Sequence, residues 1–236
     1  MKKNANLSYV LACISAYLYG SLPLVYLLGL HSGADLKQSG SGNVGVSNLV
    51  TVGGVRQALI GGLFDASKGY LPIRICRRLG YPAEVAELAG VCGVIGQCWP
   101  LFLRFNGGRG LSSFLGASFL INRRGWGIAV LPIIAGALWS FFSSFRSSRR
   151  KPGNLLKNTH GRAVPFGSFL GTLAFAFTSS LDRRREGRQR LTPVLLSFII
   201  LGRRLTAPLP DDSIHGPARN KQALVYRLLY DRNTNR

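Results

Sequence analysis

Apolar residues along this chain gather in blocks, which polar and glycine-rich connections separate. A helix needs about 20 mainly apolar residues to cross the hydrocarbon core of a bilayer. Seven blocks approach this length, and the fourth is short enough that it could be tilted or only partly inserted. The seven segments are Leu7–Leu30, Gly53–Ile75, Val85–Phe105, Gly110–Ile121, Gly125–Phe145, Val164–Leu181 and Leu191–Leu209. The pattern predicts an all-α, polytopic integral membrane helix bundle with about seven transmembrane helices.

The net charge of the chain indicates which partners it binds and leaves the predicted fold unchanged. Lys and Arg together number 30 against nine Asp and Glu, giving a formal net charge of +21, while 47% of the residues are hydrophobic. Basic residues in the connections would face anionic headgroups or anionic substrates. Nucleic-acid binding is the rival interpretation, but basic and aromatic residues do not interleave on a polar face and no known module signature is present. We therefore expect membrane lipids, and no nucleic acid, as partners.

The apolar blocks and basic connections also predict the organisation of the chain. Residues 1–210 form the expected transmembrane domain, and residues 211–236 form a basic cytoplasmic tail with a short amphipathic helix. The basic connection at 146–162 and the tail favour the cytoplasmic side, which places the loop at 37–48 inside as well. The basic run at 181–190 falls on the nominal outside and opposes this orientation. The first apolar block continues without a convincing cleavage site, so we expect a retained helix and not a signal peptide.

Three polar, glycine-rich clusters lie at helix ends assigned to one side of the membrane. They are Gly40–Asn48, Gly96–Gly110 and Gly161–Ser168. Glycines near helix ends commonly serve helix packing, so each cluster alone is more often structural. A phosphate group, however, is bound by backbone N–H groups at helix N-termini together with Arg or Lys. The three clusters together predict an anion pocket.

Two ionisable residues, Asp65 and Lys68, fall inside the second apolar segment. A charged side chain within a membrane helix is costly, so each needs a partner or a function. Their spacing of three places them on one face of a helix, where they could pair. A simple intramembrane ion pair is the structural alternative to a catalytic role.

The motifs resemble, in order, those of the integral-membrane acyl-phosphate:glycerol-3-phosphate acyltransferases, the PlsY family. The resemblance covers about Gly20 to Ser168, and the last two apolar segments and the tail match only generally. The matching motifs are GSLPLVYLLG at 20–29, GSGNVGVSN at 40–48, DASKG at 65–69, GQCWPLFLRFNGGRG at 96–110 and RAVPFGS at 162–168.

Membership of this family would imply a specific reaction. A fatty acyl group would pass from acyl phosphate to the 1-hydroxyl of glycerol 3-phosphate, giving lysophosphatidic acid for phospholipid biosynthesis. The resemblance also implies seven helices in a bacterial-type inner membrane and an active site facing the cytoplasm. It implies no cofactor and no metal, and four cysteines without CxxC spacing agree with that expectation. It leaves the oligomeric state open.

The resemblance further implies which residues serve the reaction. Peptide N–H groups of the first cluster would surround a phosphate, glycines of the second would let the backbone approach, and basic side chains would supply charge. The implied catalytic residues are Ser41, Asn43, Lys68 and Arg109. The implied substrate-binding residues are Lys37, Gly42, Gly45, Asn48, Asp65, Gln97, Gly107, Gly108, Gly110, Arg162 and Ser168.

Four positions depart from the family pattern. Thr51 stands where the family has Arg, and Gln97 where it has His; Arg109 replaces Lys, and Pro165 replaces Ser. A lost charge-assisted hydrogen bond weakens a phosphate site by about 1.5–3 kcal/mol. Gln97 can donate a hydrogen bond but cannot be protonated. Two functions are therefore open: an active acyltransferase with a rebuilt phosphate site, or a catalytically degenerate relative that binds lipid or anions or scaffolds partners.

Overall fold

The computed structural model describes residues 2–148, 163–183, 185 and 187–206, and every regular element within these ranges is helical. Each of the seven predicted segments forms helix, which confirms the predicted all-α class. The α-helices are α1 (Lys2–Gly20), α2 (Leu24–His31), α3 (Val46–Arg78), α4 (Ala83–Cys98), α5 (Leu111–Ile121), α6 (Arg123–Ser148), α7 (Ala163–Ser180) and α8 (Leu191–Thr206); the 3₁₀ turns are η1 (Leu101–Leu103) and η2 (Gly187–Arg190). The expected tail and most of the basic connection at 146–162 lie outside the described residues.

The first predicted segment is two helices and not one. The chain leaves helical geometry after Gly20 and re-enters it after Pro23, which precedes the first turn of α2. Proline lacks the N–H that a helix interior requires, so the helix is interrupted just before Pro23. Among the described helices, Asn6–His31 and Ala83–Leu103 are the two stretches that are long and apolar enough to cross a membrane by length and composition alone.

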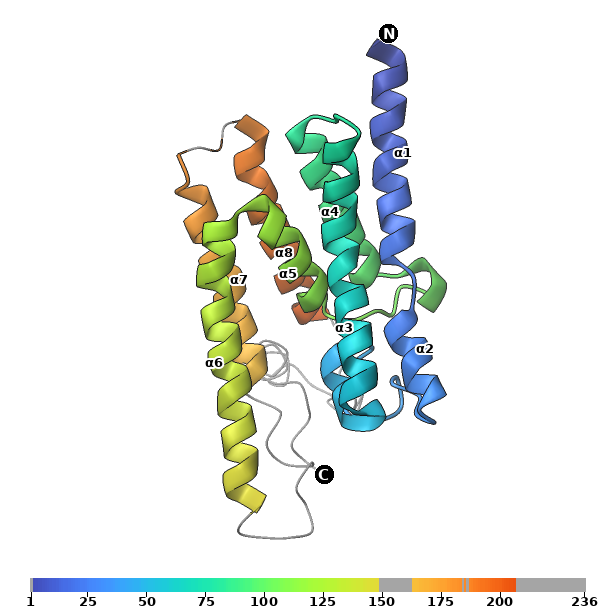
Figure 1. Ribbon diagram of the computed structural model, residues 1–236, viewed down its shortest axis with the longest axis vertical. Coiled ribbons are helices and arrows are strands. Elements are labelled where there is room, and N and C mark those ends of the chain that lie inside the picture. The colour runs from blue at the N-terminus through green and yellow to red at the C-terminus, as the bar shows by residue number, and fades with distance from the viewer. Residues whose placement is uncertain (1, 149–162, 184, 186, 207–236) are drawn as a thin grey trace, which may run out of the picture.

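Successive helices from α3 to α8 run in alternating directions (Figure 1). Short connections join α3 to α4 and α5 to α6, so each pair is antiparallel, and α6 lies alongside α7. Because the direction alternates, the N-termini of α3, α5 and α7 reach the same end of the bundle. The C-termini of α4 and α8 reach that end too, and the polar clusters therefore meet there.

Apolar side chains fill the bundle and also cover its outer surface. The buried core lies where α4 meets α3, α5 and α8, around Val94, Phe114 and Leu196. Large apolar side chains on the outside, such as Trp139 and Phe198, are 72% and 70% exposed. A surface with so many exposed apolar groups suits lipid contact.

Glycines allow close approach of neighbouring helices in the bundle. A methyl group at Gly93 of α4 would clash with the carbonyl of Lys68 on α3, and one at Gly96 would clash with the carbonyl of Tyr17 on α1. Small residues at such crossings let helix backbones touch. The packing role, which is the alternative to the anion pocket for the clustered glycines, therefore holds for Gly96.

We expect Gly116→Ala to destabilise the protein by roughly 1–3 kcal/mol, because the added methyl overpacks a close helix crossing. A Cβ atom at Gly116 of α5 would clash with the carbonyl of Ala66 on α3. Gly127→Ala in α6 is the matched control, since no heavy atom lies within 4 Å of its added methyl. The control should gain up to about 1 kcal/mol from lower unfolded-state entropy. Unfolding in detergent micelles measures both, and equal stabilities of the two variants would contradict the close crossing.

Candidate functional site

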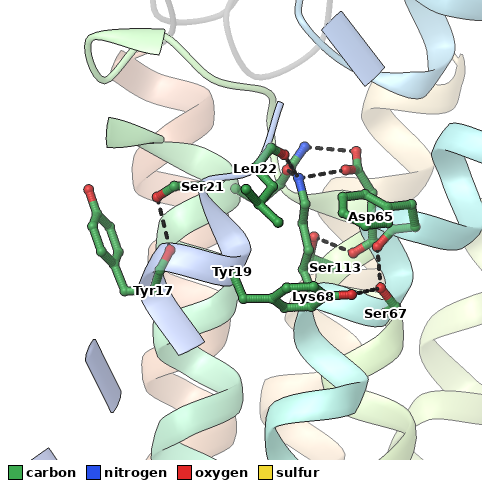
Figure 2. A network of polar contacts seen from close by, with 10 residues as sticks. Tyr17, Tyr19, Ser21, Leu22, Asp65, Ser67, Lys68 and Ser113 are labelled. Carbon is green, nitrogen blue, oxygen red and sulfur yellow. Dashed lines mark hydrogen bonds and ion pairs between the residues drawn. The ribbon is translucent and has the colours of Figure 1, made fainter. Parts of the chain in front are cut away.

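A buried polar network ties α3 to α4 and to the break between α1 and α2 (Figure 2). Lys68 Nζ lies 2.9 Å from Asp65 Oδ1, so the predicted ion pair is confirmed. The same ammonium donates to the carbonyl of Leu22 over 2.7 Å and to Oε1 of Gln97. Gln97 Nε2 in turn donates to Asp65 Oδ2 over 2.7 Å, which closes the ring of contacts.

This network fixes the position of Gln97 and uses the donors of Lys68. An ammonium has three N–H donors, and its three partners here are Asp65, Gln97 and Leu22. Lys68 is 1% exposed and lines a small cleft of about 10 Å³. These contacts let Lys68 orient the side chain of Gln97, and they leave no donor for a substrate. The predicted catalytic role of Lys68 stays a prediction.

The glycine-rich loop before α3 is organised by one side chain. Asn48 Nδ2 donates to the carbonyls of Leu36 and Ser39 over 3.0 and 2.9 Å, and its Oδ1 accepts from the N–H of Ser41 over 2.9 Å. Gly40 has a φ of 63°, and a Cβ atom there would clash with Asn48 Oδ1. The loop is therefore a built structure and not a flexible linker.

We expect Asn48→Asp to destabilise the protein by about 1–3 kcal/mol, since the carboxylate cannot donate to the two carbonyls that the amide satisfies. The Michaelis constants for phosphate-bearing substrates should rise as the loop loosens. Gln38→Glu makes the same amide-to-acid change in the same loop at an exposed side chain, so it separates charge from hydrogen bonding. Unfolding and steady-state kinetics measure both variants, and equal effects would show that only charge matters.

Two adjoining cavities lie at the end of the bundle where the clusters meet. The first, here called the loop cavity, has a volume of about 280 Å³, and the second, the helix-end cavity, about 250 Å³. Asn43 and Arg109 line both. The loop cavity is lined by Lys37, Ser41, Gly42, Asn43, Val44, Asn106, Gly107, Arg109 and Arg203. The helix-end cavity is lined by Asn43, Gly45, Val46, Ser47, Asp65, Gln97, Arg109, Gly110, Leu111, Ser112, Val164 and Arg204.

The helix-end cavity has the features of an anion site. Val46, Leu111 and Val164 on its wall belong to the first turns of α3, α5 and α7. The first N–H groups of a helix have no partner within it, and the helix dipole places partial positive charge there. Arg109 and Arg204 add two guanidinium groups to the same cavity. Helix N-termini combined with arginine favour a phosphate or carboxylate.

The second glycine cluster brings Arg109 to both cavities. A Cβ atom at Gly107 would clash with the carbonyl of Gln97, and one at Gly108 would lie 2.7 Å from the carbonyl of Val44. Only glycine fits this close backbone approach. Burial, and to a lesser degree the charge of Arg203, lower the pKa of Arg109 to about 10, so the guanidinium stays protonated at neutral pH.

The structure brings most of the predicted site residues together. The residues that line at least one of the two cavities are Lys37, Ser41, Gly42, Asn43, Gly45, Asp65, Gln97, Gly107, Arg109 and Gly110. Lys68 and Gly108 line the adjacent small cleft. The side chain of Asn48 bonds the loop backbone, and Ser168 donates from Oγ to the carbonyl of Pro165 within α7. Neither residue lines the loop cavity or the helix-end cavity. Arg162 lies outside the described residues.

Sequence reasoning missed Arg203 and Arg204, which line one cavity each from the last turn of α8. The only sequence signal was a pair of adjacent arginines at the end of the last apolar segment. Thr51 lines neither cavity, and its hydroxyl donates to the carbonyl of Ser47 over 3.4 Å. Arg203 and Arg204 of α8 thus add positive charge at the site, and position 51 adds none.

The chain resembles known glycerol-3-phosphate acyltransferases over most of its length. The family model described as glycerol-3-phosphate acyltransferase matches residues 10–201. Glycerol-3-phosphate acyltransferase 5 of Dehalococcoides mccartyi is 31% identical over 97% of this chain and 90% of that protein. The corresponding protein of Rubrobacter xylanophilus is 37% identical over 48% of this chain and 56% of its own length.

Solved structures agree at the level of the fold. The crystal structure of PlsY (YgiH), an integral membrane glycerol 3-phosphate acyltransferase, in its glycerol 3-phosphate form matches with a TM-score of 0.68 and 23% identity. The match covers 84% of this chain and 88% of that one. The lysophosphatidic acid form matches with a TM-score of 0.64. The bundle is thus the fold of an integral membrane protein, and this chain belongs to the glycerol-3-phosphate acyltransferase family.

Proposed function

We propose that the protein transfers a fatty acyl group from acyl phosphate to the 1-hydroxyl of glycerol 3-phosphate, which yields lysophosphatidic acid and inorganic phosphate. One observation carries the proposal: two adjoining cavities, both lined by Asn43 and Arg109, meet at a common end of the bundle. Each substrate has a phosphate group, and each cavity contains a set of donors and cations that suits one. The names of the similar proteins support acyl transfer to glycerol 3-phosphate.

The reaction requires the protein mainly to align the two substrates and to stabilise the charge that develops on the leaving phosphate. The hydroxyl oxygen attacks the acyl carbon, the bond from that carbon to the phosphate oxygen breaks, and the phosphate leaves with the electron pair. Positioned donors that meet the developing charge supply most of the acceleration in such a step. Arg109, shared by both cavities, is the residue best placed to serve both phosphates.

The proton of the attacking hydroxyl would pass to a phosphate oxygen of a substrate. Among the described residues that line the two cavities, Asp65 is the one carboxylate, and histidine is absent. Asp65 is already engaged by Lys68 and Gln97, which leaves it poorly suited as a general base. A pH–rate profile that exposed an essential basic group of the enzyme would contradict this route.

We further propose that the bundle crosses a bacterial-type inner membrane several times and opens its cavities to the cytoplasm. The exposed apolar exterior supports a lipid-facing bundle. Asn106→Cys, on the wall of the loop cavity and in a background without the natural cysteines, tests the orientation. A membrane-impermeant thiol reagent should label it in inverted vesicles and not in right-side-out cells. The opposite pattern would reverse the orientation.

Turnover is tested with the full chain in lipid nanodiscs, supplied with acyl phosphate and glycerol 3-phosphate. We expect lysophosphatidic acid and phosphate in equal amounts. The double variant Thr51→Arg, Gln97→His restores the family's residues at two departing positions. Lack of turnover in both proteins would reject the enzyme and favour a catalytically degenerate relative that binds anions or lipid.

A further inference from the structure

We propose that Arg203 of α8 is a positioning residue, which fixes the backbone of Gly107 and Gly108 so that the next residue, Arg109, directs its guanidinium group toward a substrate phosphate. The inference rests on the proposed function and deepens it, because it assigns a role in the same site to a helix that the recognisable motifs do not reach. Arg203 would act through the loop backbone and not through the reacting atoms.

The contacts of Arg203 are those of a two-point clamp. Its Nη2 donates to the carbonyl of Gly107 over 2.8 Å, and its Nε donates to the carbonyl of Gly108 over 3.1 Å. The guanidinium carbon lies 5.7 Å from the centre of the Trp99 ring, and the residue is 4% exposed. A planar, rigid fork that is buried and stacked in this way fixes two successive carbonyls at once.

Fixing the carbonyls also fixes the N–H groups that follow them. In a trans peptide the C=O and N–H point in opposite directions. Holding the carbonyls of Gly107 and Gly108 therefore turns the N–H groups of Gly108 and Arg109 away from Arg203. Gly108 is buried and lines the small cleft, and the next residue, Arg109, lines both the loop cavity and the helix-end cavity. Fixing the two peptide groups that precede the Cα atom of Arg109 therefore fixes where its side chain leaves the backbone and enters those cavities.

The charge of Arg203 also favours an anion at this site. Among the ion pairs formed by described residues, none involves Arg203, and its partners are two carbonyls and a ring. A buried cation without a carboxylate is costly for stability. Because Arg203 also lines the loop cavity, its charge adds to the attraction for an anion there. Substitutions of Arg203 can separate the effect of its two hydrogen bonds from the effect of its charge.

The test uses the full chain in nanodiscs, with the variants Arg203→Lys and Arg203→Gln. Lysine retains the charge but is a single-point donor, so it cannot hold both carbonyls. We expect both variants to bind inorganic phosphate about tenfold more weakly by calorimetry and to lose roughly 10- to 100-fold in kcat/KM, since small misplacement of donors has such effects. Michaelis constants for both substrates should rise more than kcat falls.

Arg185→Gln is the matched structural control. Arg185 is also buried and donates to a backbone carbonyl, that of Ile121, over 2.7 Å, and it contacts Glu87. These contacts lie at the C-terminal end of α5, away from the cavities at its N-terminus. The control should lose stability and keep its phosphate affinity. A purely structural Arg203 would give the same result as Arg185→Gln, and this would overturn the proposal.

The remaining outcomes separate the clamp from the reaction. Wild-type phosphate affinity and kinetics in Arg203→Lys would show that only charge matters and would overturn the clamp. If the wild-type protein binds phosphate without turnover and both Arg203 variants lose that binding, the clamp is supported while the proposed reaction fails. If the wild-type protein turns over and the Arg203 variants match it, the clamp fails alone.

Discussion

Replacing Arg109 by Gln should lower kcat/KM by roughly 100- to 1,000-fold, the usual effect of removing one donor that stabilises developing charge. Arg109 is the one cationic residue shared by the loop cavity and the helix-end cavity as the structure describes them. Its loss would weaken binding of both phosphates and remove positive charge where the leaving phosphate forms. Steady-state kinetics with each substrate varied in turn measure the effect, and both Michaelis constants should rise.

Arg104→Gln is the control for this variant. Arg104 lies in the same connection between α4 and α5, is exposed, and lines neither cavity. Its replacement removes the same charge and should change kcat/KM less than about threefold, because exposed charges are screened by salt. Arg109→Lys should fall between the wild type and Arg109→Gln, since lysine retains charge without the planar fork. Equal activities of Arg109→Gln and Arg104→Gln would exclude Arg109 from the site.

Asp65→Ala is expected to destabilise the protein by about 3–5 kcal/mol, because it leaves a buried charge without its partner. Lys68 is 1% exposed, and Asp65 supplies its carboxylate contact at 2.9 Å. The change also removes the acceptor of Gln97 Nε2. Unfolding in detergent micelles reports the loss of stability.

The double variant Asp65→Ala, Lys68→Met tests the cause. Removing both charges takes away the uncompensated ion, so the double variant should be more stable than Asp65→Ala alone. Recovery should be incomplete, because the carbonyl of Leu22 and Oε1 of Gln97 lose their donor. A double variant that is less stable than Asp65→Ala would show that the ion pair is not the source of the effect.

Local sequence was sufficient to predict the helices. Blocks of apolar residues gave seven segments, and each is helical, because helix formation and lipid burial depend on neighbours within a few turns. The ion pair between Asp65 and Lys68 could be predicted for the same reason, since residues three apart share a helix face. The break at Ser21–Pro23 was missed because apolar content outweighed the proline signal.

The glycine clusters predicted an anion site, but their members have different roles in the structure. Ser41, Asn43 and Arg109 line cavities, while Asn48 satisfies the loop backbone from within. Sequence spacing cannot separate these roles, because the direction of an amide depends on which carbonyls the folded loop presents to it. Ser168, a predicted substrate-binding residue, donates within α7 and lines neither the loop cavity nor the helix-end cavity.

The sequence by itself determined that this chain is a helical membrane protein of the glycerol-3-phosphate acyltransferase family, because apolar blocks and ordered glycine motifs are local signals. Only the tertiary structure decided that the N-termini of α3, α5 and α7 surround one cavity and that Arg203 clamps a loop 95 residues away in sequence. Such contacts depend on the alternating direction of the helices and on their packing, which no local pattern encodes.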